Sequence, residues 1–129
     1  MSRVLKFRIW DKANKEYKIL GATGLDARNG DVIDYYNEGN RLGGPEEYDV
    51  EQCTGLIDKN GKEIYEGDIV KYKLYADSRL DYIDEVFYST ISGAFMVGDE
   101  DNIRTLDCLI NVEVIGNIHE NKELLGESD

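Results

Sequence analysis

Apolar side chains alternate with basic ones between residues 4 and 10, and a second apolar segment at residues 17–20 follows the turn-forming residues 11–15. A period of two is typical of a strand with one buried face, and aromatic and β-branched residues suit such a surface. The beginning of the chain is therefore predicted to form a β-hairpin.

Similar alternation recurs through the rest of the chain and predicts five further extended segments. They are residues 48–56, 69–75, 82–91, 93–98 and 112–118. Asn60-Gly61 predicts a tight hairpin turn, because both residues accept the positive φ of its two central positions. Gly67 predicts a second turn. Several short strands at close spacing are typical of a small barrel or a sandwich, so we expect a mainly β fold with little helix.

Three regions depart from this regular pattern. Residues 21–44 are rich in glycine and asparagine and are predicted to be mostly loop, with one short strand at 31–36. Residues 102–110 fit either a strand or a short helix, and residues 120–125 predict a single helical turn. A chain of 129 residues is the size of one domain. We expect a single domain over 1–129, with a hairpin and variable loop region at 1–47, a barrel-like core at 48–125 and a tail at 126–129.

The acidic charge is concentrated in the second part of the chain. Residues 1–50 hold eight basic and nine acidic side chains (net −1), and residues 51–129 hold seven and eighteen (net −11). This balance argues against binding to nucleic-acid phosphates or to an anionic membrane surface. No run approaches the roughly 18 apolar residues that span a bilayer, and the chain starts without an apolar leader. We expect a protein of a reducing cytoplasm.

Few residues suit catalysis or cofactor binding. His119 is the only histidine, and an exposed or capping imidazole is its expected role. Cys53 and Cys108 lie beside apolar residues without a cationic neighbour in sequence, so we expect two buried small hydrophobes rather than reactive thiols. A zinc site would need all three of these residues and a carboxylate. No glycine-rich phosphate loop is present. The sequence predicts no catalytic, cofactor-binding or metal site.

Two clusters of carboxylates raise the question of a cation. Residues 58–63 place oxygen ligands at alternate positions but lack the length and the distant glutamate of a calcium loop, so the hairpin explains them better. Asp99, Glu100 and Asp101 form a denser run that is typical of a solvated loop tip. The aromatic residues of the second half are expected to pack in the core and to contact proteins, since a stacking platform for nucleic acid would also need a positive groove.

Three blocks resemble the YopX family of phage and prophage proteins. They are Lys6–Asp11, Gln52–Val70 and Glu113–Asn121, and the middle block is the most distinctive. The resemblance implies an origin in phages or prophages of bacteria, a largely β fold with a Src-homology-3-like barrel, and no established activity. It implies no catalytic motif. The chain departs from the family pattern at residues 21–47 and 75–82.

Binding surfaces of small barrels usually lie on loops at one rim. By this analogy the candidate partner surface is the loop between Tyr75 and Tyr82 together with Asp99, Glu100 and Asp101.

These features favour a non-enzymatic phage accessory protein that binds a protein partner or forms a homo-oligomer. An alternative is an acidic mimic of nucleic acid that occupies a host DNA-binding protein. A metal-dependent nuclease built on the clustered carboxylates ranks last.

Overall fold

The structure is a computed structural model that describes residues 5–18, 22–34, 38–98 and 101–126. The chain divides into two compact units. One is formed by Lys6–Gln52, and the other by the residues from Cys53 onward together with Leu5. The predicted strand residue Val4 and the apolar positions 19 and 20 lie outside the described residues.

The N-terminal unit begins with the predicted hairpin, which is confirmed. Strands β1 (Phe7–Asp11) and β2 (Glu16–Tyr17) pair antiparallel, with Trp10 opposite Tyr17. The other edge of β1 pairs antiparallel with the first five residues of β6 (Tyr48–Ile57). Burial follows the predicted alternation only in part, because Ile9, Trp10 and Asp11 are all buried.

The glycine-rich region holds more strand than the sequence predicted. β3 (Thr23–Leu25), β4 (Val32–Asp34) and β5 (Asn40–Gly43) form an antiparallel sheet in this order. Only β4 falls within the strand expected at 31–36, and residues 35 and 36 lie outside the described residues. Strands of three or four residues are too short to show a period of two, so their pairing, rather than their composition, reveals them.

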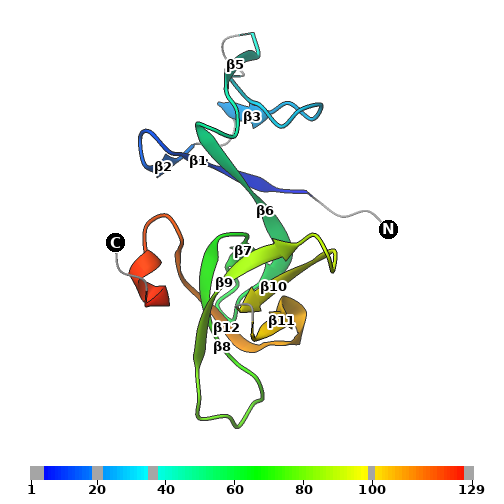
Figure 1. The fold of residues 1–129 in the computed structure, drawn as a ribbon, viewed down its shortest axis with the longest axis vertical. Coiled ribbons are helices and arrows are strands. Elements are labelled where there is room, and N and C mark those ends of the chain that lie inside the picture. The colour runs from blue at the N-terminus through cyan, green and yellow to red at the C-terminus, as the bar shows by residue number, and fades with distance from the viewer. Residues whose placement is uncertain (1–4, 19–21, 35–37, 99–100, 127–129) are drawn as a thin grey trace. The chain divides into compact units, whose positions relative to one another are not determined.

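The C-terminal unit contains the larger sheet. Its short strand β7 (Glu63–Tyr65) pairs with the end of β6, and five further strands form one antiparallel sheet in the order β11-β10-β9-β8-β12. These are β8 (Asp68–Lys73), β9 (Tyr82–Ser89), β10 (Ala94–Gly98), β11 (Ile103–Thr105) and β12 (Ile110–Asn117). The sheet curls into a half-barrel (Figure 1). The predicted mainly β, barrel-like fold with little helix is confirmed.

The core of this unit lies on one face of the curled sheet. Its buried side chains are Ile64, Val70, Tyr72, Val86, Val97 and Leu106. Val70 and Tyr72 are two residues apart on β8, as the predicted alternation with lysines requires. Val86 and Val97 face each other across β9 and β10. Burial of these branched and aromatic side chains supplies the main stabilisation of the unit.

The predicted turn at Asn60-Gly61 is confirmed, but its geometry differs. Only Gly61 has positive φ (84°), and the Asp58 carbonyl accepts the Gly61 N–H at 3.0 Å. This bond closes a four-residue turn, and the Asp58 carboxylate also accepts the N–H groups of Asn60 and Lys62. Gly67, with φ of 84°, makes the second predicted turn between β7 and β8.

The ambiguous segment 102–110 contains both kinds of structure. β11 is followed by a single 3-10 turn, η1 (Leu106–Cys108), before β12 begins. This turn places Leu106 in the core and exposes Cys108, so the prediction that Cys108 is buried was wrong. The tail predicted as one helical turn forms the 3-10 helix η2 (Lys122–Leu125). No described helix is long and apolar enough to cross a membrane.

Candidate functional site

A polar hollow lies on the face of the large sheet that carries the core. Its volume is about 310 Å³ and it is lined by Tyr82, Asp84, Asn102 and Arg104, which we call the Tyr82 pocket. Tyr82 and Asp84 are two residues apart on β9, so their side chains point to the same face of the sheet. Arg104 of β11 joins them because it is opposite Val97, which is buried in the core.

The hydroxyl group of Tyr72 connects the two charged residues of this pocket. It donates a hydrogen bond to Asp84 Oδ2 at 2.6 Å and accepts one from Arg104 Nη1 at 3.3 Å. The Tyr72 ring itself is fully buried. A buried core side chain therefore fixes the positions of Asp84 and Arg104 in the pocket.

Aromatic contacts hold Arg104 and Tyr82 in place. The Tyr72 and Tyr82 rings stack with centroids 5.7 Å apart and planes inclined by 22°. Arg104 Cζ lies 5.2 Å from the centroid of the Tyr82 ring, within the range of a cation–π contact.

Burial raises the pKa of Tyr72 well above its ordinary value, and the adjacent Asp84 carboxylate raises it further. Because the phenol keeps its proton, Tyr72 acts as a neutral hydrogen-bond donor and is unsuited to the role of a nucleophile or base.

The β8–β9 loop, residues 74–81, leads directly into Tyr82. Ser78 organises it: the Ser78 N–H donates to the Tyr75 carbonyl, and the Ser78 hydroxyl contacts both the N–H and the carbonyl of Leu80. Lys73 Nζ reaches the Ser78 carbonyl and Asp81 Oδ1, each at 3.0 Å. The hydrogen bond from Lys73 lowers the pKa of Asp81. Two large apolar side chains of this loop, Tyr75 and Leu80, are 60% and 64% exposed.

The residues predicted as a partner surface fall into three groups. Tyr82 lines the pocket and Tyr75 lies on the β8–β9 loop. Asp101 is exposed and directly precedes the pocket residue Asn102. Asp99 and Glu100 lie outside the described residues.

Sequence reasoning missed Asp84, Asn102 and Arg104 as pocket residues. The position of Asp84 two residues after Tyr82 on a predicted strand was the available indication, since it places both side chains on one face. Nothing in the local sequence brings Arg104 to them, because the pairing of β9, β10 and β11 does so.

The other residues that the sequence suggested for chemistry make contacts that belong to the fold. Asp58 accepts three backbone N–H groups, and Cys53 Sγ lies 3.7 Å from Glu63 Oε2. Among the described residues, no three His, Cys, Asp or Glu side chains are grouped as a metal site. The half-buried His119 follows the turn at Asn117, whose side-chain oxygen accepts the N–H groups of His119 and Glu120.

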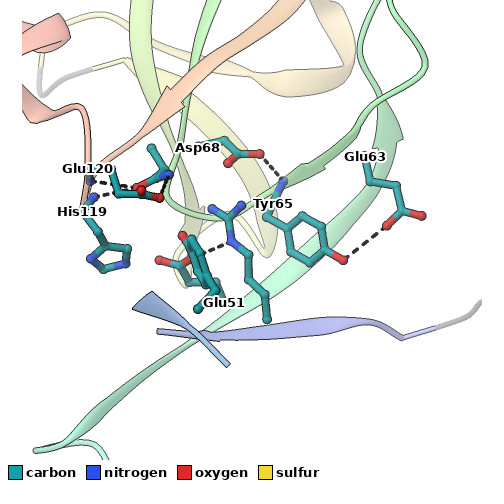
Figure 2. Close-up of polar contacts among 9 residues, drawn as sticks. Glu51, Glu63, Tyr65, Asp68, His119 and Glu120 are labelled. Atoms are coloured by element: carbon teal, nitrogen blue, oxygen red, sulfur yellow. Dashed lines mark hydrogen bonds and ion pairs between the residues drawn. The ribbon is translucent and has the colours of Figure 1, made fainter. Parts of the chain in front are cut away.

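Figure 2 shows how Tyr65 stabilises the turn between β7 and β8. Its N–H donates to the buried carboxylate of Asp68 at 2.8 Å, and its hydroxyl donates to Glu63 at 3.3 Å. These three residues belong to the middle block, so part of the distinctive sequence of that block serves turn formation.

The N-terminal unit has a polar cluster and a hollow of its own. Glu51, which is labelled in Figure 2, accepts hydrogen bonds from Arg8 Nε at 2.7 Å and from the Tyr17 hydroxyl at 2.9 Å. Arg8 also lies over the Tyr17 ring, 4.7 Å from its centroid. A separate hollow of about 280 Å³ is partly lined by Val32 and Tyr48.

Comparison with known families decides the identity of the chain. The sequence profile of the family described as YopX protein matches residues 6–126. The chain belongs to the YopX family. The match extends over nearly the whole YopX chain and confirms the family indicated by its three sequence blocks. None of the curated proteins matches this YopX sequence.

A solved structure supports the YopX fold. The crystal structure of protein EF1440 from Enterococcus faecalis is similar, with a TM-score of 0.64 and 29% sequence identity. The match covers 96% of this YopX chain and 99% of the other chain. The similarity therefore concerns the complete β fold, and the function has to be argued from the residues themselves.

Proposed function

We propose that this YopX protein is a non-enzymatic accessory protein of a phage or prophage, which acts in the bacterial cytoplasm by binding another protein. The observation that carries the proposal is the exposure of two large apolar side chains, Tyr75 and Leu80 (60% and 64%), on one loop of the C-terminal unit. The raised pKa of Tyr72 and the use of Asp58 within the fold support a role other than catalysis.

The β8–β9 loop has the character of a binding loop. Ser78 and Lys73 occupy its polar groups internally, so its shape does not depend on the partner. A preformed loop loses little conformational entropy on binding, and tyrosine is among the residues that contribute most at protein interfaces. Tyr75 and Leu80 would form the apolar centre of such an interface.

The charge of the chain favours a basic partner. Residues 51–129 carry a net charge of −11, so a second copy would bring the same sign of charge to this surface. A different protein, with an apolar patch surrounded by lysine and arginine, would instead be attracted.

The nucleic-acid mimic is the weaker alternative. A mimic would present its carboxylates outward as a row of charges, but several carboxylates of this unit have partners within the fold. Asp84 accepts the Tyr72 hydroxyl, Asp81 pairs with Lys73, and Glu113 lies 3.7 Å from Lys59. These contacts favour a patch with an apolar centre over a uniformly acidic surface.

The test compares affinity-tagged full-length proteins in lysate of the bacterial host. The variant Tyr75→Ser/Leu80→Ser removes both exposed apolar side chains, and Ile91→Ser is the matched control because Ile91 is 98% exposed in the turn between β9 and β10. Quantitative mass spectrometry measures the captured proteins. Light scattering of the purified protein measures self-association.

We expect wild type and Ile91→Ser to capture the same basic protein in equal amounts, and the double variant to lose it. Increasing salt should release this protein from wild type. A protein captured equally by all three would contradict the role of the loop. A stable oligomer that the double variant dissociates would replace the basic partner with a second copy. A wild type that remains monomeric and captures no basic protein above the double variant would overturn the proposal.

A further inference from the structure

We propose that the Tyr82 pocket binds a small zwitterion of the α-amino acid class. This inference goes beyond the proposed function, because it uses Asp84, Asn102 and Arg104 rather than the exposed side chains of the β8–β9 loop. The pocket places one carboxylate and one guanidinium group in the same hollow.

The two charged groups are close but do not pair directly. Both bond to the same Tyr72 hydroxyl, so Asp84 Oδ2 and Arg104 Nη1 lie within two hydrogen-bond lengths of each other. Within the described part of the chain, neither residue makes an ion pair, since the pairs found there join other side chains. The stacking of Arg104 on Tyr82 holds the guanidinium group in this position.

Asp84 and Arg104 can therefore each form further hydrogen bonds in the pocket. The Tyr72 hydroxyl occupies one oxygen of Asp84, and among described residues the second oxygen has no hydrogen-bond donor. Arg104 uses one of its five N–H donors in its bond to Tyr72. A ligand ammonium group can donate to Asp84 while a ligand carboxylate accepts from Arg104.

A zwitterion suits this arrangement better than a single ion. An anion bound to Arg104 would face the Asp84 carboxylate, and a cation bound to Asp84 would face the Arg104 guanidinium. Only a ligand that carries both charges can place an ammonium group at Asp84 and a carboxylate at Arg104. The volume of about 310 Å³ is at the lower end of the range for small-molecule sites and suits a ligand of this size.

The test is an NMR titration of isotope-labelled full-length protein at constant ionic strength. Glycine and L-alanine are the probes. N-acetylglycine, which lacks the ammonium charge, and glycinamide, which lacks the carboxylate, are the controls. We expect saturable shifts of the Asp84, Asn102 and Arg104 amides with both probes, and affinity at least about tenfold lower for each control ligand.

Variants assign the binding to the pocket. Asp84→Asn and Arg104→Gln should each weaken glycine binding at least about tenfold, because each removes a charge-assisted hydrogen bond. Arg28→Gln is the matched control, since Arg28 is an exposed residue of the N-terminal unit paired with Asp26. Asn102→Ala alters an exposed residue that lines the pocket and should also weaken binding.

The proposal is overturned if wild type shows no saturable shift up to about 50 mM glycine. It is also overturned if either control ligand binds as well as glycine, or if Arg104→Gln and Asn102→Ala both retain full affinity. The Tyr75→Ser/Leu80→Ser variant should still bind glycine, so failure of this site and failure of the protein-binding loop are observed separately.

Discussion

Asp58 is buried and stabilises the turn between β6 and β7 through its carboxylate. Oδ1 accepts the N–H groups of Asn60 and Lys62 at 2.8 and 2.9 Å, and Oδ2 accepts the N–H of Val114 at 3.0 Å. Burial by itself would raise the pKa of Asp58, but these backbone donors outweigh it and lower the pKa below its ordinary value. One side chain thus joins the turn to strand β12.

Replacement of this carboxylate should destabilise the protein. Asp58→Ala leaves three backbone donors without their acceptor, so we expect a loss of about 2 to 4 kcal/mol in the free energy of unfolding, measured with urea. Asp77→Ala, in the exposed part of the β8–β9 loop, is the control and should change stability by less than about 0.5 kcal/mol. Equal stability of the two variants would contradict this role.

The contribution of Asp58 should also depend on pH in a defined direction. Its pKa is lower in the folded state than the value of about 3.9 in the unfolded chain. The carboxylate therefore contributes its full stabilisation above about pH 5, and this is lost as pH falls through the folded pKa. The difference between wild type and Asp58→Ala should shrink in acid. A difference that stays constant between about pH 7 and pH 2 would refute this linkage.

The ends of β10 and β11 meet at a close approach that only glycine permits. Gly98 has φ of 107°, and a Cβ atom there would lie 1.8 Å from the Asn102 carbonyl oxygen. Gly93, directly before β10, has φ of 65°, but a Cβ atom there would meet only the Tyr88 hydroxyl, at 3.9 Å. A side chain at Gly98 would therefore meet both a backbone clash and an unfavourable φ, whereas a side chain at Gly93 would meet only the unfavourable φ.

Alanine at these positions should therefore have unequal effects. Gly93→Ala should cost about 1 kcal/mol for its left-handed conformation, and Gly98→Ala distinctly more, because the backbone at Asn102 must also move. Urea unfolding measures the difference, and NMR should show the Asn102 and Arg104 amides displaced only in Gly98→Ala. Similar costs for both variants would show that the contact at Asn102 relaxes freely.

Most of the strands that the sequence predicted correctly are long enough to show a period. β8 and β9 have six and eight residues, and their alternation was visible before the structure. β3, β5 and β11 have three or four residues and were missed or left ambiguous. Their extended conformation depends on hydrogen bonds to neighbouring strands, which local sequence does not encode.

Across the whole molecule, the principal cluster of buried side chains belongs to the C-terminal unit. Val70, Tyr72, Val86 and Val97 pack together on the central strands β8, β9 and β10. In the N-terminal unit, the strands β3, β4 and β5 are short, and only Val32 of them contributes a fully buried apolar side chain. The two regions should differ in local stability.

Amide hydrogen exchange of the full-length protein should resolve this difference. We expect the slowest exchange at the hydrogen-bonded amides of β8, β9 and β10, and exchange at least about tenfold faster in β3, β4 and β5. NMR or mass spectrometry measures the rates residue by residue or by peptide. Equal protection throughout would mean that the short strands open only with global unfolding.

The sequence by itself determined the features that depend on neighbours within a few residues. These are the strand periods, the turns at Asn60-Gly61 and Gly67, the acidic charge and the blocks that identify the family. The tertiary structure decided which distant residues meet. Tyr72 and Arg104 are 32 residues apart and share a hydrogen bond only because strand pairing and the curl of the sheet bring β8 and β11 to one hollow. Such contacts depend on long-range packing, whose energy is not carried by any local pattern.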